Sequence, residues 1–101
     1  MGEQLSLKSK EPRLEVVVPA GCERVLGRRA EQVDVCMPNR TITGRHARVF
    51  ERAGIWYVED LGSKSGVYVN DAPTRGAQPI DTGDTIRLGT VKLEVSESSE
   101  P

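Results

Sequence analysis

Three short segments carry most of the side chains that could do chemistry in this chain. They are Gly27-Arg28-Arg29, Thr41–His46 and Gly62–Gly66. Together they supply guanidinium, ammonium and hydroxyl groups, and their glycines let a ligand approach backbone N–H groups closely. A phosphate group needs these donors, because arginine binds it as a planar fork while hydroxyls and N–H groups fill its remaining lone pairs. If the fold gathers the three segments, they form an anion site.

His46, the only histidine, lies in the second segment. A catalytic histidine needs a nucleophile or an acid as its partner, and the sequence offers no such triad. A four-ligand zinc site made of cysteine and histidine is excluded, because the chain has two cysteines and one histidine. We expect a framework role with a hydrogen-bonded ring for His46; direct contact with a ligand is the alternative. Asp60 and Asp84 are expected to hold turns rather than to act as acids.

Positive charge is concentrated in the middle of the chain. The formal net charge is −1, yet residues 24–52 hold seven arginines against three carboxylates, so this segment carries +4 and the remainder −5. A cationic region on a mildly acidic protein predicts a local anionic partner. Nucleic acid is not expected, because the chain has only four aromatic residues for base stacking. A membrane is not expected either, because no apolar run approaches the ~20 residues of a span.

The elements that must position these segments are short and have a period of two. Apolar residues recur at every second position through 13–18, 33–37, 85–89 and 91–95, and in 55–58 Trp56 and Val58 alternate with Ile55 and Tyr57. Glycine and proline, which punctuate turns, make up 16 of 101 residues, above the usual share of roughly 12%. Only residues 28–34 allow a single helical turn. Many short strands without a helix-length pattern predict an all-β sandwich or barrel, in which loops gather at the ends.

A chain of this length forms one domain with one core. The polar ends, 1–12 and 96–101, are expected to be disordered tails around a folded body at 13–95. The first twelve residues lack the apolar stretch of a secretory signal, so we expect a cytoplasmic protein. Cys22 and Cys36 are then expected to be reduced, in or near the core. Trp56 is expected in the core, because it alternates with Val58.

The order and spacing of the motifs resemble the forkhead-associated (FHA) domain, a phosphothreonine-peptide binding module. The family pattern is Gly-Arg after an early strand, Ser-x-x-His, an Asp before Ser-x-Asn-Gly, then Val-Asn, Gly-Asp and Leu-Gly. The matching motifs here are Gly27-Arg28, Thr43–His46, Asp60–Gly66, Val69-Asn70, Gly83-Asp84 and Leu88-Gly89. Each motif alone is common, but their combination over about residues 13–95 is specific.

The resemblance implies a sandwich of two antiparallel sheets with about eleven strands, and neither catalysis nor a cofactor. It implies that Arg28 contacts the phosphate, that Thr43 donates its hydroxyl, and that the region of Gly44 and Arg45 adds backbone donors or charge. The loop at 63–65 would hold the main chain of the peptide through Ser63, Lys64 and Ser65. The residues implied to support the loops are Gly27, His46, Gly66 and Asn70. The implied partner is a phosphothreonine-containing protein of a Ser/Thr kinase pathway, bound by a monomer.

Four positions depart from the family pattern, one of them Val67, where the family usually has a threonine after Asn-Gly. Thr43 replaces the serine, which keeps the hydroxyl and adds a methyl group. Gly44 stands where many members have a basic or amide side chain. Ser65 replaces the asparagine that holds the peptide main chain in the family; it is shorter and has no amide. These departures leave a second function open, namely a phosphate-independent docking or oligomerisation domain on the same fold.

Overall fold

The computed structural model describes residues 3–11 and 13–99, and its regular structure is strands with one short 3-10 turn. The predicted all-β sandwich of about eleven strands is confirmed. The single 3-10 turn, η1 (Ala30–Gln32), falls inside the range 28–34 that the sequence allowed for one turn. The strands are β1 (Glu3–Lys10), β2 (Arg13–Pro19), β3 (Glu23–Gly27), β4 (Val35–Cys36), β5 (Ala47–Arg52), β6 (Ile55–Asp60), β7 (Val67–Val69), β8 (Ala72–Pro73), β9 (Ala77–Ile80), β10 (Thr85–Leu88) and β11 (Val91–Ser99).

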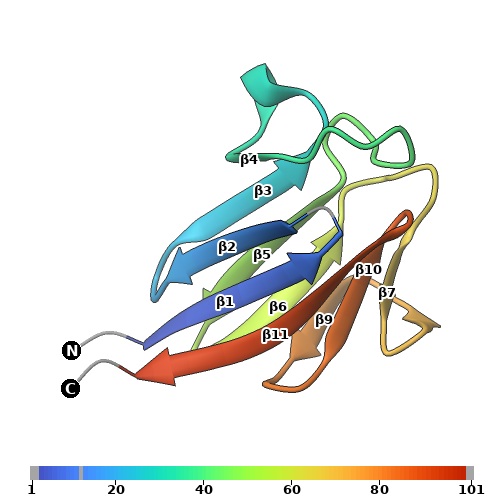
Figure 1. The fold of residues 1–101 in the computed structure, drawn as a ribbon. Helices are drawn as coiled ribbons and strands as arrows, with labels where there is room; N and C mark the ends of the chain where they lie inside the picture. The colour runs from blue at the N-terminus through green and yellow to red at the C-terminus, as the bar shows by residue number, and fades with distance from the viewer. Residues whose placement is uncertain (1–2, 12, 100–101) are drawn as a thin grey trace.

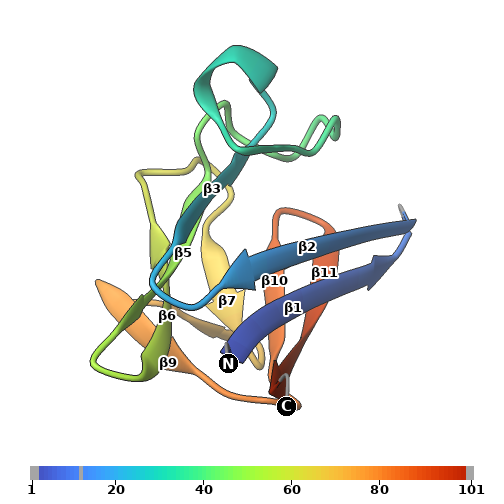
Figure 2. The ribbon, with the colours of Figure 1, turned by 90° about the vertical axis from the view of Figure 1, so that its left-hand side faces the viewer.

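The strands form two sheets that pack face to face (Figure 1). One sheet has the order β2-β1-β11-β10-β7-β8 and the other β4-β3-β5-β6-β9. All pairs are antiparallel except β3 with β4, which are parallel. The connections after β3, before β5 and between β6 and β7 lie at one end of the sandwich (Figures 1 and 2). These connections carry the three segments singled out above. No helix in the described part of the chain is long and apolar enough to cross a membrane.

The core lies between the sheets and follows the period of two. On β2, for example, Val16 and Val18 are buried whereas Val17 is exposed. Trp56 is 1% exposed, which confirms its predicted place in the core. Both cysteines are free thiols, as expected, but Cys36 is exposed rather than in the core, because β4 has only two residues at a sheet edge.

The predicted disordered tails are wrong for most of their length. Residues 3–10 form β1, which lies between β2 and β11 inside a sheet, and Leu5 and Leu7 are fully buried. The segment has only two apolar residues among polar ones, so its composition resembles a linker; its neighbours supply the pairing that its composition does not indicate. Likewise β11 continues past residue 95, because Ser96 and Glu97 pair with Ser6 and Leu5. Residues 1–2, 12 and 100–101 lie outside the described residues.

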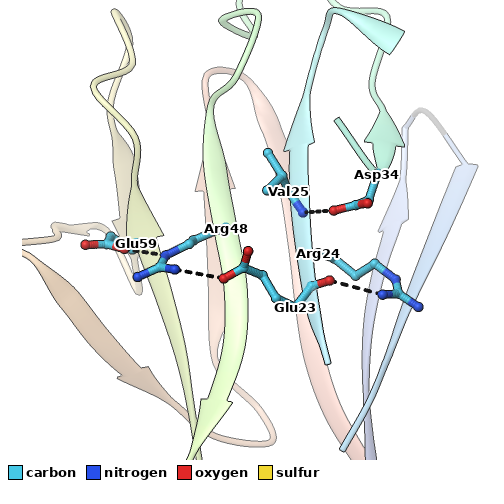
Figure 3. Close-up of polar contacts among 6 residues, drawn as sticks. All are labelled: Glu23, Arg24, Val25, Asp34, Arg48 and Glu59. Carbon is cyan, nitrogen blue, oxygen red and sulfur yellow. Dashed lines mark hydrogen bonds and ion pairs between the residues drawn. The ribbon is translucent and has the colours of Figure 1, made fainter. Parts of the chain in front are cut away.

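The end of β3 is tied to the segment that returns from it (Figure 3). The Asp34 carboxylate accepts the N–H of Val25 at 2.8 Å, and the Asp34 N–H donates to the Val25 carbonyl at 2.9 Å. These bonds close the 28–34 connection against β3, so the direction in which the chain leaves Gly27 is fixed. On the same sheet the Arg48 guanidinium bridges Glu23 and Glu59. Hydrogen bonding to Glu59 is the main cause that raises the pKa of Arg48 above its usual value.

Candidate functional site

The first two segments lie backbone against backbone. The Arg28 N–H donates to the Thr43 carbonyl at 3.1 Å, and the Arg29 N–H donates to the Gly44 carbonyl at 3.2 Å. Gly27 makes this approach possible, because a Cβ at that position would lie 2.1 Å from the Gly44 carbonyl oxygen. No side chain fits in that space.

The third segment folds on its own side chains before it meets the others. The Asp60 carboxylate accepts the N–H groups of Gly62 and Ser63 at 2.9 and 2.7 Å, and the Ser63 hydroxyl accepts the Gly66 N–H at 2.9 Å. Asp60 therefore holds a turn, as predicted, through bonds of the Asx type. Glycine suits position 66, whose φ is +86°.

Two hydrogen bonds connect this loop to the second segment. The Lys64 N–H donates to the Thr43 hydroxyl oxygen at 3.0 Å, and the Ser65 hydroxyl donates to the Thr41 carbonyl at 2.6 Å. The Thr43 hydroxyl is thus an acceptor within the protein, and its own hydrogen is left to donate to a ligand. The Ser65 hydroxyl is the reverse case, because its hydrogen is used within the protein and only its lone pairs remain.

His46 lies beneath these loops and is fully buried. Its Nδ1 accepts the Thr43 N–H at 3.0 Å, so Nε2 carries the ring hydrogen and donates it to the Gly66 carbonyl at 2.8 Å. Its backbone adds two further bonds, from its N–H to Leu26 and from Leu61 to its carbonyl. The ring therefore joins the second segment to the third, and it is not part of the surface that a ligand would touch.

The three segments enclose a hollow of about 380 Å³. Its lining is made of cations, hydroxyl residues, a glycine and one apolar residue: Arg28, Arg29, Arg40, Lys64, Thr41, Thr43, Ser65, Gly44 and Ile42. Four of these side chains are cationic and none is a carboxylate. Within the described residues, none of the four cations forms an ion pair. The field in the hollow is therefore suited to an anion with more than one negative charge.

Five of the seven predicted ligand-binding residues line this hollow, and two do not. Arg28, Thr43, Gly44, Lys64 and Ser65 are brought together. Arg45 is exposed and lies outside the lining, and Ser63 is also outside it, with its hydroxyl accepting the Gly66 N–H. Among the predicted supporting residues, Asn70 lies on the β7–β8 turn, where its amide accepts the Thr85 N–H and donates to Asp84.

The prediction missed Arg29 and Arg40 as ligand-binding candidates. The side chain of Arg29 packs over Gly44, with its Cδ and Cγ 3.1 Å from where a Cβ would be. A glycine at 44 thus leaves room for a cation from a neighbouring segment. Arg29 stands in the first of the three segments, beside Arg28, and this was its signal; for Arg40 the only signal was its place in the +4 segment, and charge alone does not say which arginines converge. The others are used elsewhere: Arg48 pairs with two glutamates, and Arg52 lies over the Phe50 ring.

Metal binding finds no support in the same region. Among residues 3–11 and 13–99, no group of three or more His, Cys, Asp or Glu side chains is arranged to hold a metal ion. The chemistry available in the hollow is the binding of an anion by charge-assisted hydrogen bonds.

Comparisons with known proteins agree with the geometry. The FHA-domain family model matches residues 24–89. FhaB, an FHA domain-containing protein of Mycolicibacterium smegmatis, is 33% identical over 78 residues, which are 77% of this chain and 50% of FhaB. The chain thus spans about half the length of that relative.

Solved structures share the fold over the whole chain. The FHA domain of the CT664 protein from Chlamydia trachomatis superposes with a TM-score of 0.84 at 20% identity, over 98% of this chain and 100% of that one. A structure from an analysis of phosphothreonine-dependent FHA domain interactions gives a TM-score of 0.79 at 24% identity, over 100% and 99% of the two chains. The motifs, the two-sheet fold and the family match together place this chain in the FHA-domain family.

Proposed function

We propose that this protein is a phosphothreonine-dependent protein–protein interaction module that recruits partners phosphorylated by a Ser/Thr kinase. The observation that carries the proposal is the hollow at the loop end of the sandwich. It is lined by four cations that form no ion pair with any described residue, by a hydroxyl that accepts a backbone N–H and keeps its own hydrogen, and by no carboxylate. A phosphate dianion on a peptide satisfies all of these groups at once.

In the proposed complex Arg28 binds two phosphate oxygens with its guanidinium fork, and the Thr43 hydroxyl donates to a third. Arg29, Arg40 and Lys64 add positive charge around the group. Each charge-assisted hydrogen bond contributes about 1.5–3 kcal/mol. A peptide loses conformational freedom when it binds, so a few such bonds leave a dissociation constant of roughly micromolar order.

Threonine rather than serine is the proposed carrier of the phosphate. Ile42 is the apolar residue in the lining, so it is the residue we assign to the threonine methyl group. The family resemblance implies the same preference. One solved relative of this fold comes from work on phosphothreonine-dependent interactions, which adds support.

Binding by this module needs no catalytic step, and we propose that the domain acts as a cytoplasmic monomer. Relatives such as FhaB extend beyond the matched region. Recruitment by the hollow would then bring a phosphorylated partner to whatever segment accompanies the domain in such a protein.

A specific observation also favours a second function, phosphate-independent docking on the same fold. The Ser65 hydroxyl gives its hydrogen to the Thr41 carbonyl, whereas the family asparagine at this position has an amide to offer to a peptide main chain. With fewer hydrogen bonds to the peptide main chain, the binding affinity would depend more on the peptide's sequence than on its phosphate.

Binding to a peptide library decides between the two functions. A degenerate library with a fixed central phosphothreonine is passed over the immobilised protein, and the same library without phosphate is the control. We expect retention of the phosphorylated library alone. Equal retention of both libraries would support the docking function, and retention of neither would contradict both.

A further inference from the structure

A second, larger hollow lies on the sheet that contains β1 and β11, where these two strands separate. Its volume is about 830 Å³, and its lining is Lys8, Ser9, Lys10, Glu11, Thr85, Thr90, Lys92, Leu93 and Glu94. None of these residues lines the first hollow, which contains Arg28, Arg29 and Arg40 and is called the arginine hollow from here on. None belongs to the motifs of the FHA pattern that bind phosphate.

The hollow exists because the pairing of β1 with β11 stops early. The two strands pair from Glu3 with Ser99 to Lys8 with Glu94, and then the ladder ends. β1 continues against β2 as far as Lys10, and β11 continues against β10 as far as Val91. In an unbroken register Lys10 would stand directly opposite Lys92, and like charges in that position are destabilising. The two lysines therefore face an opening rather than each other.

A buried donor without a partner lines the same opening. Ser9 is 7% exposed, and its hydroxyl has no hydrogen-bond partner among the described residues. A buried hydroxyl left unsatisfied is costly, so such a group marks a place where a ligand or ordered water completes the bonding. Lys10 and Lys92 line the same hollow, so an acceptor with negative charge is the partner that suits this lining.

The larger hollow adjoins the arginine hollow. Thr41 lines the arginine hollow and Thr90 lines the larger one, and their hydroxyl oxygens are 3.2 Å apart. The Thr90 N–H also donates to the Thr41 hydroxyl at 3.0 Å. A peptide whose phosphothreonine lies in the first hollow thus has one flank next to the second.

We propose that the larger hollow binds a second anionic group, a carboxylate or a phosphate, on the flank of the same phosphothreonine peptide. This inference rests on the proposed function, because that function brings the peptide to the Thr41–Thr90 contact. The Lys10 and Lys92 ammonium groups and the Ser9 hydroxyl are the donors. Glu11 and Glu94 reduce the net charge of the lining to +1, which favours a short acidic segment over a long polyanion.

Paired peptides test the inference. Each peptide carries one phosphothreonine. Within a pair, one peptide has four glutamates on one flank and the other has four glutamines at the same positions. One pair is made for each flank. A third peptide carries a single phosphoserine in place of the glutamates. The variant is Lys10→Gln with Lys92→Gln. The matched control, Arg52→Gln with Arg75→Gln, also removes two charges but lies outside both hollows.

We expect wild type to bind one glutamate-flanked peptide roughly three- to tenfold more tightly than its glutamine twin at ~0.1 M salt, as two partly exposed charge pairs allow. The lysine double variant should reduce that ratio below twofold, and the arginine control should keep it. The phosphoserine peptide shows whether phosphate does better than carboxylate. A ratio near one on both flanks in wild type, or a ratio unchanged in the lysine variant, would overturn the inference.

The affinity of the glutamine-flanked peptide tests the proposed function separately. If it does not bind, the proposed function fails, and tetraglutamate is then the probe for the larger hollow. Saturable amide shifts at Ser9, Lys92 and Leu93 that disappear in the lysine variant would keep the hollow as an anion site. Their absence would remove it.

Discussion

At the scale of residues, Arg28 contributes to the site in two separable ways. Its backbone N–H holds Thr43, and its side chain lines the arginine hollow. Arg28→Ala removes only the second contribution, so we expect phosphopeptide affinity to fall at least a hundredfold, about 2.7 kcal/mol, with the fold unchanged. Calorimetric titration gives the affinity, and an amide NMR spectrum reports the fold. Arg75→Ala, an exposed substitution outside the hollow, is the control. Affinity within threefold of wild type would contradict the assignment of Arg28.

His46 has a different role, because its buried ring satisfies one donor and one acceptor on two loops. His46→Ala leaves the Thr43 N–H and the Gly66 carbonyl without partners, so we expect a loss of about 1–3 kcal/mol in the free energy of unfolding. Urea melts of the variant and of wild type measure it. An unchanged midpoint together with abolished binding would show that His46 contacts the ligand instead.

The types of residue at the site were easier to predict than the hydrogen bonds that each residue makes. Arginine, threonine, lysine and serine signalled an anion site, and four predicted residues of these types, Arg28, Thr43, Lys64 and Ser65, do line one hollow together with Gly44. The use of each hydroxyl depends on a partner far away in sequence. Ser65, for instance, donates to Thr41 across 24 positions, and no spacing rule predicts that bond.

At the scale of elements, the close approach of two loops depends on the absence of a side chain at Gly27. Gly27→Ala would bring a Cβ to 2.1 Å from the Gly44 carbonyl oxygen, so the two segments must separate and lose the bonds from Arg28 and Arg29. We expect about 1–3 kcal/mol less stability, as for other overpacked sites, together with weaker phosphopeptide binding. Thermal or urea melts and calorimetric titration measure the two effects.

Gly44→Ala is the matched control for that substitution. The new Cβ would meet only the side chain of Arg29, at 3.1 Å, and that side chain is free to move. Its stability should stay close to that of wild type. Equal losses in the two variants would mean that the contact between the loops does not depend on Gly27.

The strand β1 shows where sequence patterns fail. Strands were predicted at 13–18, 33–37, 55–58, 85–89 and 91–95, because their apolar alternation is visible within the segment itself. Residues 3–10 have two leucines among polar residues, and the burial of Leu5 and Leu7 comes from β2, β11 and the opposite sheet. Burial of that kind is set by tertiary context, which local composition does not carry.

Leu7 tests the importance of this strand. It is fully buried, so Leu7→Ala should cost about 2–5 kcal/mol in the free energy of unfolding. Val17→Ala, on the exposed face of β2, should cost much less. Urea denaturation compares the two. If Leu7→Ala lowers stability by less than Val17→Ala does, β1 is not part of the cooperative core.

At the scale of the whole molecule, the sandwich separates the binding end from the chain ends. Glu3 at the start of β1 pairs with Ser99 at the end of β11. The start of β1 and the end of β11 lie away from the loops after β3, before β5 and between β6 and β7 (Figure 1). The fold also divides the positive charge of residues 24–52 between two places. Arg28, Arg29 and Arg40 line the arginine hollow. Arg48 belongs to an ion-pair network on the outer face of a sheet.

The central claim is that this domain recognises a phosphate on threonine, and one measurement tests it directly. A peptide selected from the library is titrated calorimetrically into wild type in three forms, with phosphothreonine, phosphoserine or threonine at the centre. We predict a roughly micromolar dissociation constant for phosphothreonine, weaker binding of phosphoserine, and a loss of at least a hundredfold without the phosphate. Equal affinity for the phosphothreonine and threonine forms would contradict the claim.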